Sequence, residues 1–194
     1  MKKIAIIAAG FGQKQTELTE TISLLVSLSE FKAQFKIFSF DLSTPLNHHE
    51  LFPLDSLNMN DYDALIFPGG LGVATVLSNW STNKHDMKVE PIIVKNILHC
   101  FEASKPIGAI CLAPLLLAKV LSQYSPYITL GEHYSNSDIV QKWGAHLEPC
   151  PSTDFITDRN TKIITTPAYM NDHVTPYQVF CGIRALTKEL VEMA

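Results

Sequence analysis

The chain has 194 residues, of which 46% are hydrophobic and 18% are charged, and its formal net charge is −4. This length suits one sizeable domain, so we expect a single domain over residues 1–194. The mild acidity and the lack of a Lys/Arg-rich run argue against nucleic-acid and membrane partners. The longest apolar runs have the length of strands, too short to span a bilayer.

The first half of the chain predicts strands alternating with helices. The pattern indicates strands at 3–8, 35–40 and 64–67, and helices over 16–31, 73–78 and 89–104. The stretch 41–60 is polar and has no predicted element. The first helix is expected to bury the apolar residues Leu18, Ile22, Leu25, Val26 and Leu28.

The second half continues the alternation. It predicts a strand at 107–110, a helix at 114–121, a strand at 127–130, a short helix at 137–143, a hairpin over 155–166 and a last helix over 175–192. Such strand–helix–strand units imply an α/β fold with a mostly parallel sheet covered on both faces. Ligands bind beyond the carboxyl ends of the strands in sheets of this kind.

The cysteines suggest chemistry rather than cross-linking. Cys100, Cys111, Cys150 and Cys181 show no Cys-x-x-Cys spacing, which predicts neither a zinc site nor a disulfide framework. We therefore expect a reducing, cytoplasmic location, no metal and no cofactor.

Cys111 is the main candidate for catalysis. It ends the strand at 107–110, and a helix-forming run begins at Pro114. Such a strand-to-helix turn lifts a cysteine out of the sheet to a helix N-terminus, where backbone N–H groups favour the thiolate. The arrangement predicts a nucleophile elbow, although the Gly-x-Ser-x-Gly signature is absent. A small buried apolar cysteine is the alternative interpretation.

Gly69 and Gly70 follow the strand at 64–67, at the same edge of the predicted sheet. Glycines let a ligand approach the backbone closely, and the N–H groups of Gly70 and Leu112 could form an oxyanion hole. The alternative interpretation of the two glycines is a tight turn.

Glu17 and Glu20 lie in the first turns of the helix that follows the first strand. Residues three apart share a helix face, so both carboxyl groups could point into the crevice and orient Cys111. Ordinary placement of negative charge at a helix N-terminus is the alternative.

Several motifs together resemble the ThiJ/PfpI superfamily of class I glutamine amidotransferase-like proteins. Within it they are most similar to the ElbB-like branch, also called isoprenoid biosynthesis or sigma cross-reacting protein. The resemblance runs nearly end to end. It rests on the segments Asp63–Gly72, Leu77–Trp80, Lys105–Pro114, Gly144–Pro151 and Lys162–Met170.

The resemblance implies a flavodoxin-like three-layer α/β/α sandwich and, commonly, a homodimer. It implies that Cys111 lies beside a protonated glutamate, which by position is Glu20, with Glu17 one turn before it. It also implies Gly70 and Leu112 as oxyanion donors. The activity implied for the ElbB-like branch is at best a weak cofactor-independent glyoxalase.

The sequence departs from the resemblance at Leu112, where protease-like and chaperone-like members have a histidine. The stretch 41–60 is also shorter than the resemblance leads us to expect, which reduces a loop that could cover the site. His133 and Glu132 are the candidates for an auxiliary group, although a solvated loop histidine is the favoured interpretation of His133.

Two functional hypotheses remain open at this level. In the first, a Cys111 thiolate attacks a small carbonyl substrate, a 2-oxoaldehyde, and Glu20 transfers the proton. In the second, the protein binds a metabolite or senses an oxidant through Cys111 without turnover. A glutaminase role is disfavoured, because no histidine can be assigned to a Cys-His-Glu triad.

Overall fold

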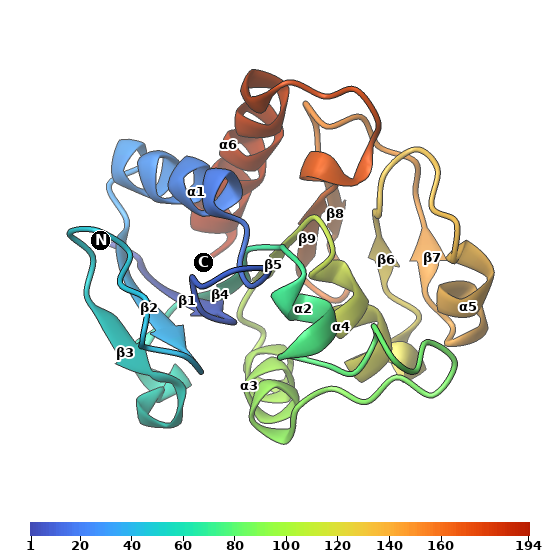
Figure 1. Ribbon diagram of the computed structural model, residues 1–194, viewed down its shortest axis with the longest axis horizontal. Helices are drawn as coiled ribbons and strands as arrows, with labels where there is room; N and C mark the ends of the chain where they lie inside the picture. Colours follow the sequence, from blue (N-terminus) through green and yellow to red (C-terminus); the bar gives the residue numbers. More distant parts are fainter.

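The computed structural model describes all 194 residues, as a seven-stranded sheet between two layers of helices (Figure 1). The strands of this sheet are β1 (Lys3–Ala8), β2 (Gln34–Ser39), β3 (Leu51–Pro53), β4 (Ala64–Phe67), β5 (Ile107–Ile110), β8 (Ile156–Asp158) and β9 (Ile163–Thr166). The helices are α1 (Leu18–Glu30), α2 (Gly72–Thr75), α3 (Pro91–Glu102), α4 (Pro114–Val120), α5 (Ser137–Lys142) and α6 (Pro176–Met193). Two short strands, β6 (Tyr127–Ile128) and β7 (His146–Leu147), form a separate parallel pair. The predicted α/β sandwich is confirmed.

The sheet has the strand order β3-β2-β1-β4-β5-β9-β8, and only β8 runs antiparallel to its neighbour. From β1, the next strands β2 and β3 are added on one side of the sheet. From β4, the strands β5 and β9 are added on the other side. The order therefore reverses between β1 and β4, and doubly wound sheets bind ligands in the crevice at such a switch point. The loops after β1, β4 and β5 all reach this crevice.

Each face of the sheet has its own apolar core. On one face, α1 and α6 pack over a cluster of 18 buried residues that includes Ile6, Ile66 and Ile164. On the other face, a cluster of 30 buried residues joins the sheet to α2, α3 and α4. The last predicted helix is confirmed as α6, and its residues Ile183 and Leu186 are fully buried in this core.

The predicted inner face of α1 is wrong at Leu18, Ile22 and Val26, which are 54%, 40% and 51% exposed. The buried face contains leucines together with the polar residues Glu20, Thr21, Ser23 and Ser27. Thr21 and Ser27 donate their hydroxyls to carbonyl groups one turn back on the helix, at 2.7 Å in both cases. Because these hydroxyls are satisfied within the helix, burying them needs no outside partner.

The stretch 41–60, predicted without elements, contains β3, which pairs in parallel with β2, and two 3-10 turns (Leu54–Ser56 and Met59–Asp61). Buried Leu54 and Met59 anchor these turns against the core. The strand predicted at 127–130 is shorter, because the Thr129 N–H donates to the Thr165 side chain instead of continuing a backbone ladder. The predicted hairpin is confirmed as the antiparallel pair β8–β9.

Candidate active site

Cys111 occupies a tight turn between β5 and α4. Its backbone is left-handed, with φ of +60°, which is costly for a residue other than glycine. The Cys111 N–H donates to the Thr166 carbonyl at 2.9 Å, and the Ala113 N–H donates to the Ile110 carbonyl at 3.0 Å. Pairing with β9 on one side and the start of α4 on the other hold the strained residue. The predicted sharp turn from strand to helix at Cys111 is therefore confirmed.

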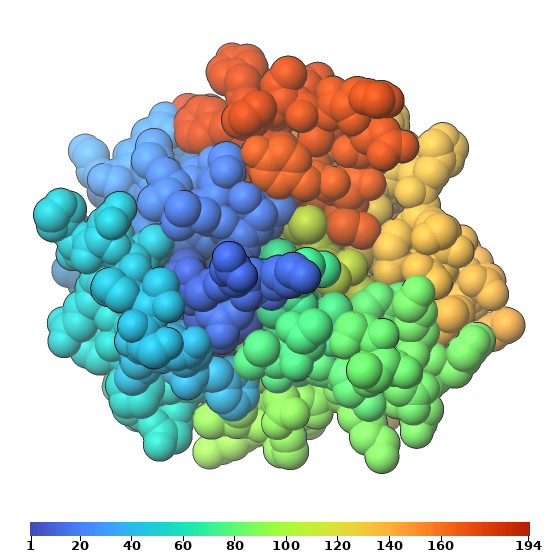
Figure 2. Space-filling model, viewed as in Figure 1, coloured from blue at the N-terminus to red at the C-terminus, as the bar shows by residue number.

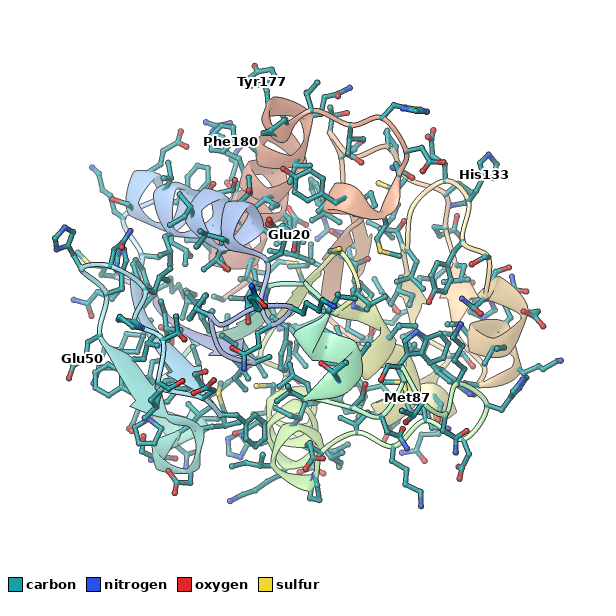
Figure 3. All side chains as sticks on the ribbon, in the orientation of Figure 1. Glu20, Glu50, Met87, His133, Tyr177 and Phe180 are labelled. Atoms are coloured by element: carbon teal, nitrogen blue, oxygen red, sulfur yellow. The ribbon has the colours of Figure 1, made fainter.

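Glu20 lies in the first turn of α1 and points towards the centre of the molecule (Figure 3). It is completely buried, and its Oε2 accepts the Gly69 N–H at 3.0 Å. Its side chain also hydrogen-bonds with Cys111, and the Tyr169 N–H donates to its carboxyl group. Its other oxygen, Oε1, has no hydrogen-bond partner. The site therefore contains a carboxyl group beside the cysteine with one oxygen free.

The surroundings of Glu20 favour its protonated form. Burial raises the pKa of Glu20 from its ordinary value of 4.5 to about 8, and the nearby charge of Glu17 adds to this increase. Hydrogen bonds from Cys111, Gly69 and Tyr169 act in the opposite direction and are outweighed. Most Glu20 side chains are consequently neutral at pH 7.

The thiol of Cys111 is also neutral, which corrects the expectation that the turn favours the thiolate form of the free protein. Burial raises the pKa of Cys111 well above its ordinary value, and the charge and hydrogen bond of Glu20 raise it further. The N–H groups of Gly70 and Leu112 donate to the sulfur and lower the pKa, as expected for oxyanion donors, but burial dominates. Cys111 therefore needs a base before it can act as a nucleophile.

Gly69 lies between Cys111 and Glu20, in close contact with both side chains. A Cβ atom on Gly69 would lie 2.5 Å from the Cys111 Cβ and 2.6 Å from Glu20 Oε2. Both distances are far below normal contact, and both neighbours are buried. Only a glycine lets these two side chains approach each other at this point.

Gly70 is needed for a different reason. Its φ is +106°, and a Cβ there would lie 2.4 Å from the Gln15 carbonyl oxygen. The Glu17 N–H donates to the Gly69 carbonyl, and the Gly72 N–H donates to the Gln15 carbonyl, at 3.0 and 2.9 Å. The loop before α1 is thus bonded directly to the loop after β4, which aligns Glu20 with the oxyanion donors.

Glu17 is brought to the site only indirectly. It is the N-cap residue of α1, and its Oε2 accepts the Glu20 N–H at 2.5 Å. Its carboxylate therefore stays at the helix N-terminus, where it satisfies an otherwise unpaired N–H group. Its effect on the site is the negative charge that it places near Glu20.

The structure does not bring the side chains of His133 and Glu132 to Cys111. Both residues are exposed, and His133 points outward at the edge of the molecule (Figure 3). The Glu132 N–H instead donates to Asn171 Oδ1 at 2.7 Å. Sequence reasoning missed Asn171, whose only signal is its position directly after the segment Lys162–Met170.

The crevice opens on one face of the molecule. In Figure 2 the yellow-green segment after β5 is visible between the blue loop after β1, green α2 and the orange segment after β9. Cys111 itself is 8% exposed. No group of three His, Cys, Asp or Glu residues is arranged to hold a metal ion. No helix has both the length and the apolar character needed to cross a membrane.

The fold of the chain is similar to that of class I glutamine amidotransferase-like proteins, and its structural neighbours include ThiJ/PfpI proteins. No protein-family model matches the chain. Its homologues are glutamine amidotransferase-like class 1 domain proteins. One is the human mitochondrial glutamine amidotransferase-like class 1 domain-containing protein 3. It is 27% identical to this chain over an alignment of 225 positions, which covers 98% of this chain and 83% of that protein.

Solved structures share the fold. An isoprenoid biosynthesis protein with an amidotransferase-like domain from Ehrlichia chaffeensis matches with a TM-score of 0.85 and 22% identity, covering 100% of this chain and 99% of the other. A ThiJ/PfpI domain protein from Brachyspira murdochii matches with a TM-score of 0.68 and 13% identity, covering 99% and 98% of the two chains. These similarities agree with the family resemblance of the sequence motifs.

Proposed function

We propose that this protein is a weak, cofactor-independent glyoxalase that converts a small 2-oxoaldehyde into a 2-hydroxy acid. The observation that supports this most is the buried carboxyl group of Glu20, which has one free oxygen and hydrogen-bonds with the elbow thiol. A single carboxyl group can act first as a base and then as an acid, so the reaction does not require a histidine.

The reaction begins with ionised Glu20, which takes the proton of the Cys111 thiol. The thiolate attacks the aldehyde carbon and forms a hemithioacetal, and the N–H groups of Gly70 and Leu112 stabilise the negative oxygen. With a pKa of about 8, roughly a tenth of Glu20 is ionised at pH 7. The scarcity of this base explains why the expected turnover is slow.

The second stage is an internal oxidation and reduction within the substrate. Glu20 first gives the thiol proton to the negative oxygen of the hemithioacetal, which makes Glu20 a base again. It then removes the hydrogen of the former aldehyde carbon as a proton, which leaves an enediolate, and returns this proton to the neighbouring carbon while the hydroxyl proton passes to the former ketone oxygen. The product is a thioester of the 2-hydroxy acid with Cys111. Water then cleaves the thioester, releasing the acid and restoring the thiol, so no external oxidant or reductant is used.

The test is lactate formation from methylglyoxal without glutathione. We expect slow turnover in the wild type that is lost in Cys111→Ala and in Glu20→Gln. Cys181→Ala is the matched control, because Cys181 is a free thiol on α6 outside the crevice. Turnover that survives in Cys111→Ala, or an inactive wild type, would contradict the proposal.

The competing hypothesis is a protein that senses an oxidant or holds a metabolite without turnover. Its weakness is the neutral thiol, since peroxide reacts with thiolates and burial raises the pKa of Cys111. Cys181 is more exposed than Cys111. Mass spectrometry after dilute peroxide decides the matter: selective oxidation of Cys111 supports sensing, whereas earlier oxidation of Cys181 argues against it.

We also propose that the protein forms a homodimer through α1. The exposed residues Leu18, Ile22 and Val26 recur every four positions along this helix, and its only acidic residue before Glu30 is the buried Glu20. Surface helices normally carry charges on the outer face, so an uncharged apolar stripe indicates a covered surface. A second copy fits this stripe, because two uncharged faces can pack about a two-fold axis without repulsion.

Analytical ultracentrifugation tests this assembly. We expect the wild type to sediment as a dimer and Ile22→Glu as a monomer with an unchanged fold by circular dichroism. Gln141→Glu is the control, because Gln141 is exposed on α5 and lies outside α1. A monomeric wild type, or a dimeric Ile22→Glu, would contradict the proposal.

A further inference from the structure

The side chain of Gln15 joins two loops at the end of the sheet where the crevice lies. Its Oε1 accepts the Gly12 N–H at 2.6 Å, and its Nε2 donates to Asp41 Oδ2 at 3.0 Å. Gly12 belongs to the loop between β1 and α1, which borders the crevice, and Asp41 belongs to the loop after β2 (Figure 2). The amide uses its oxygen for an N–H group and its nitrogen for a carboxylate, so the opposite orientation of the amide would lose both bonds.

The two glycines that flank Phe11 leave room for this side chain. A Cβ atom on Gly10 would lie 2.8 Å from Gln15 Cδ and 2.9 Å from Asp41 Cβ. A Cβ atom on Gly12 would lie 3.0 Å from Gln15 Oε1. Gly10 also has a φ of +126°, which side chains rarely tolerate. The sequence Gly10-Phe11-Gly12 is therefore explained by a loop that is built around Gln15.

Asp41 is a firm anchor for Gln15. Its Oδ1 accepts the Ser43 N–H at 2.8 Å, and its carbonyl accepts the Ser39 hydroxyl at 2.9 Å. Hydrogen bonds from Ser43 and then from Gln15 lower the pKa of Asp41 to about 2, so this carboxylate is charged at neutral pH. The bond between Gln15 and Asp41 is therefore charge-assisted, and it ties the loop before α1 to the end of β2.

The main chain beside Gln15 contacts the loop after β4, on the other side of β1. The Gln15 carbonyl accepts the Gly72 N–H at 2.9 Å, and the Glu17 N–H donates to the Gly69 carbonyl at 3.0 Å. The N–H of the same Gly69 donates to the buried Oε2 of Glu20 at 3.0 Å. Both backbone groups of Gly69 therefore bond to the segment that begins at Gln15, and the place of this segment decides how Gly69 meets Glu20.

We propose that Gln15 is a positioning residue, whose side chain holds the start of α1 where Glu20 accepts the Gly69 N–H. The effect on turnover rests on the proposed function, whereas the bond between Gly69 and Glu20 is observable without a substrate. Loss of the Gln15 bonds displaces the Glu20 carboxyl group relative to Cys111. We expect a decrease of roughly ten- to a hundredfold in kcat with a smaller change in KM, because a slightly misplaced catalytic group slows the chemical step.

Three variants isolate these bonds. Gln15→Glu keeps the shape and the acceptor for the Gly12 N–H, but it places a second carboxylate against Asp41 and breaks that bond. Adding Asp41→Asn to Gln15→Glu restores the full set with one direction reversed, because the introduced amide donates to the introduced carboxylate and still accepts the Ser43 N–H. Gln13→Glu is the matched control, since it adds the same charge to the same loop at an exposed residue.

The readout besides turnover is the NMR signal of the Gly69 amide. Gly69 is the only glycine that follows a proline in this chain, so isotopic labelling of glycine nitrogen and proline carbonyl carbon assigns its signal. Because Gly69 donates to Glu20, its shift should titrate with a midpoint near pH 8, and Glu20→Gln should abolish this titration. We expect the titration to be lost in Gln15→Glu, restored in the double variant and unchanged in Gln13→Glu.

The outcomes separate the two proposals. If the wild type shows no turnover but the Gly69 titration is lost in Gln15→Glu and restored by Asp41→Asn, the glyoxalase proposal fails and the role of Gln15 stands. A titration that persists in Gln15→Glu, that Asp41→Asn does not restore, or that is absent from the wild type refutes the role of Gln15.

Asp41→Asn alone replaces Gln15→Glu if the latter does not fold. It turns one of the two acceptor oxygens of Asp41 into a donor, so it cannot serve both Gln15 and Ser43 as the carboxylate does. We expect a weakened Gly69 titration in this variant, and an unchanged one would equally refute the role of Gln15.

Discussion

The substitution Glu20→Gln should remove the contribution of Glu20 to the pH dependence of the unfolding free energy. Glutamine has nearly the same shape and can still accept the Gly69 N–H, but it does not titrate. The pKa of Glu20 is about 8 in the folded protein and close to its ordinary 4.5 in the unfolded chain. Between these values the folded state binds more protons than the unfolded state, so the contribution of Glu20 to stability falls as the pH rises.

The magnitude follows from the two pKa values. Between pH 5 and pH 8, wild-type protein should lose about 3–4 kcal/mol of unfolding free energy that Glu20→Gln does not lose. All other titrating groups are common to both proteins and cancel in the difference. Urea denaturation at pH 5, 6, 7 and 8, followed by circular dichroism, measures the effect.

The expected result is a difference in stability between variant and wild type that grows in favour of the variant with increasing pH. Parallel curves across this range would refute the reasoning, because they would mean that the pKa of Glu20 is ordinary despite its burial. Glu17→Gln is a useful companion variant. It removes the nearby charge that raises the pKa of Glu20, so its activity profile should shift to lower pH.

The remaining predictions concern packing and hydrogen bonds. Gly69→Ala should cost about 1–3 kcal/mol in urea unfolding and abolish turnover, because its Cβ would overlap Cys111 and Glu20; unchanged stability would mean that the two side chains can separate. Thr175→Ala should cost about 1 kcal/mol, since it removes the capping box of α6, and an unaffected unfolding midpoint would show that solvent replaces the cap. Lys105→Met should cost about 1–3 kcal/mol, because Lys105 Nζ donates to two backbone carbonyls at 2.6 and 2.7 Å, and a neutral effect would show these bonds to be dispensable.

Local patterns were sufficient to predict most of the fold and the elbow. An apolar run of four residues, a cysteine and a helix-forming run specify the turn at Cys111, because the strand and the helix are both encoded by neighbouring residues. The end of β4 was predicted for the same reason, since Gly69 and Gly70 stand directly after it. The N–H donors of Gly70 and Leu112 follow from these two turns.

Packing, in contrast, decided which way α1 faces and how the site is charged. The apolar period of α1 suggested Leu18, Ile22 and Val26 as its core face, but self-satisfied hydroxyls allow the opposite face to be buried and leave these residues exposed. Residues distant in sequence surround Glu20 and Cys111, and their burial outweighs the N–H donors that the local pattern revealed. The pair is neutral because desolvation depends on the assembled core, which no short segment encodes.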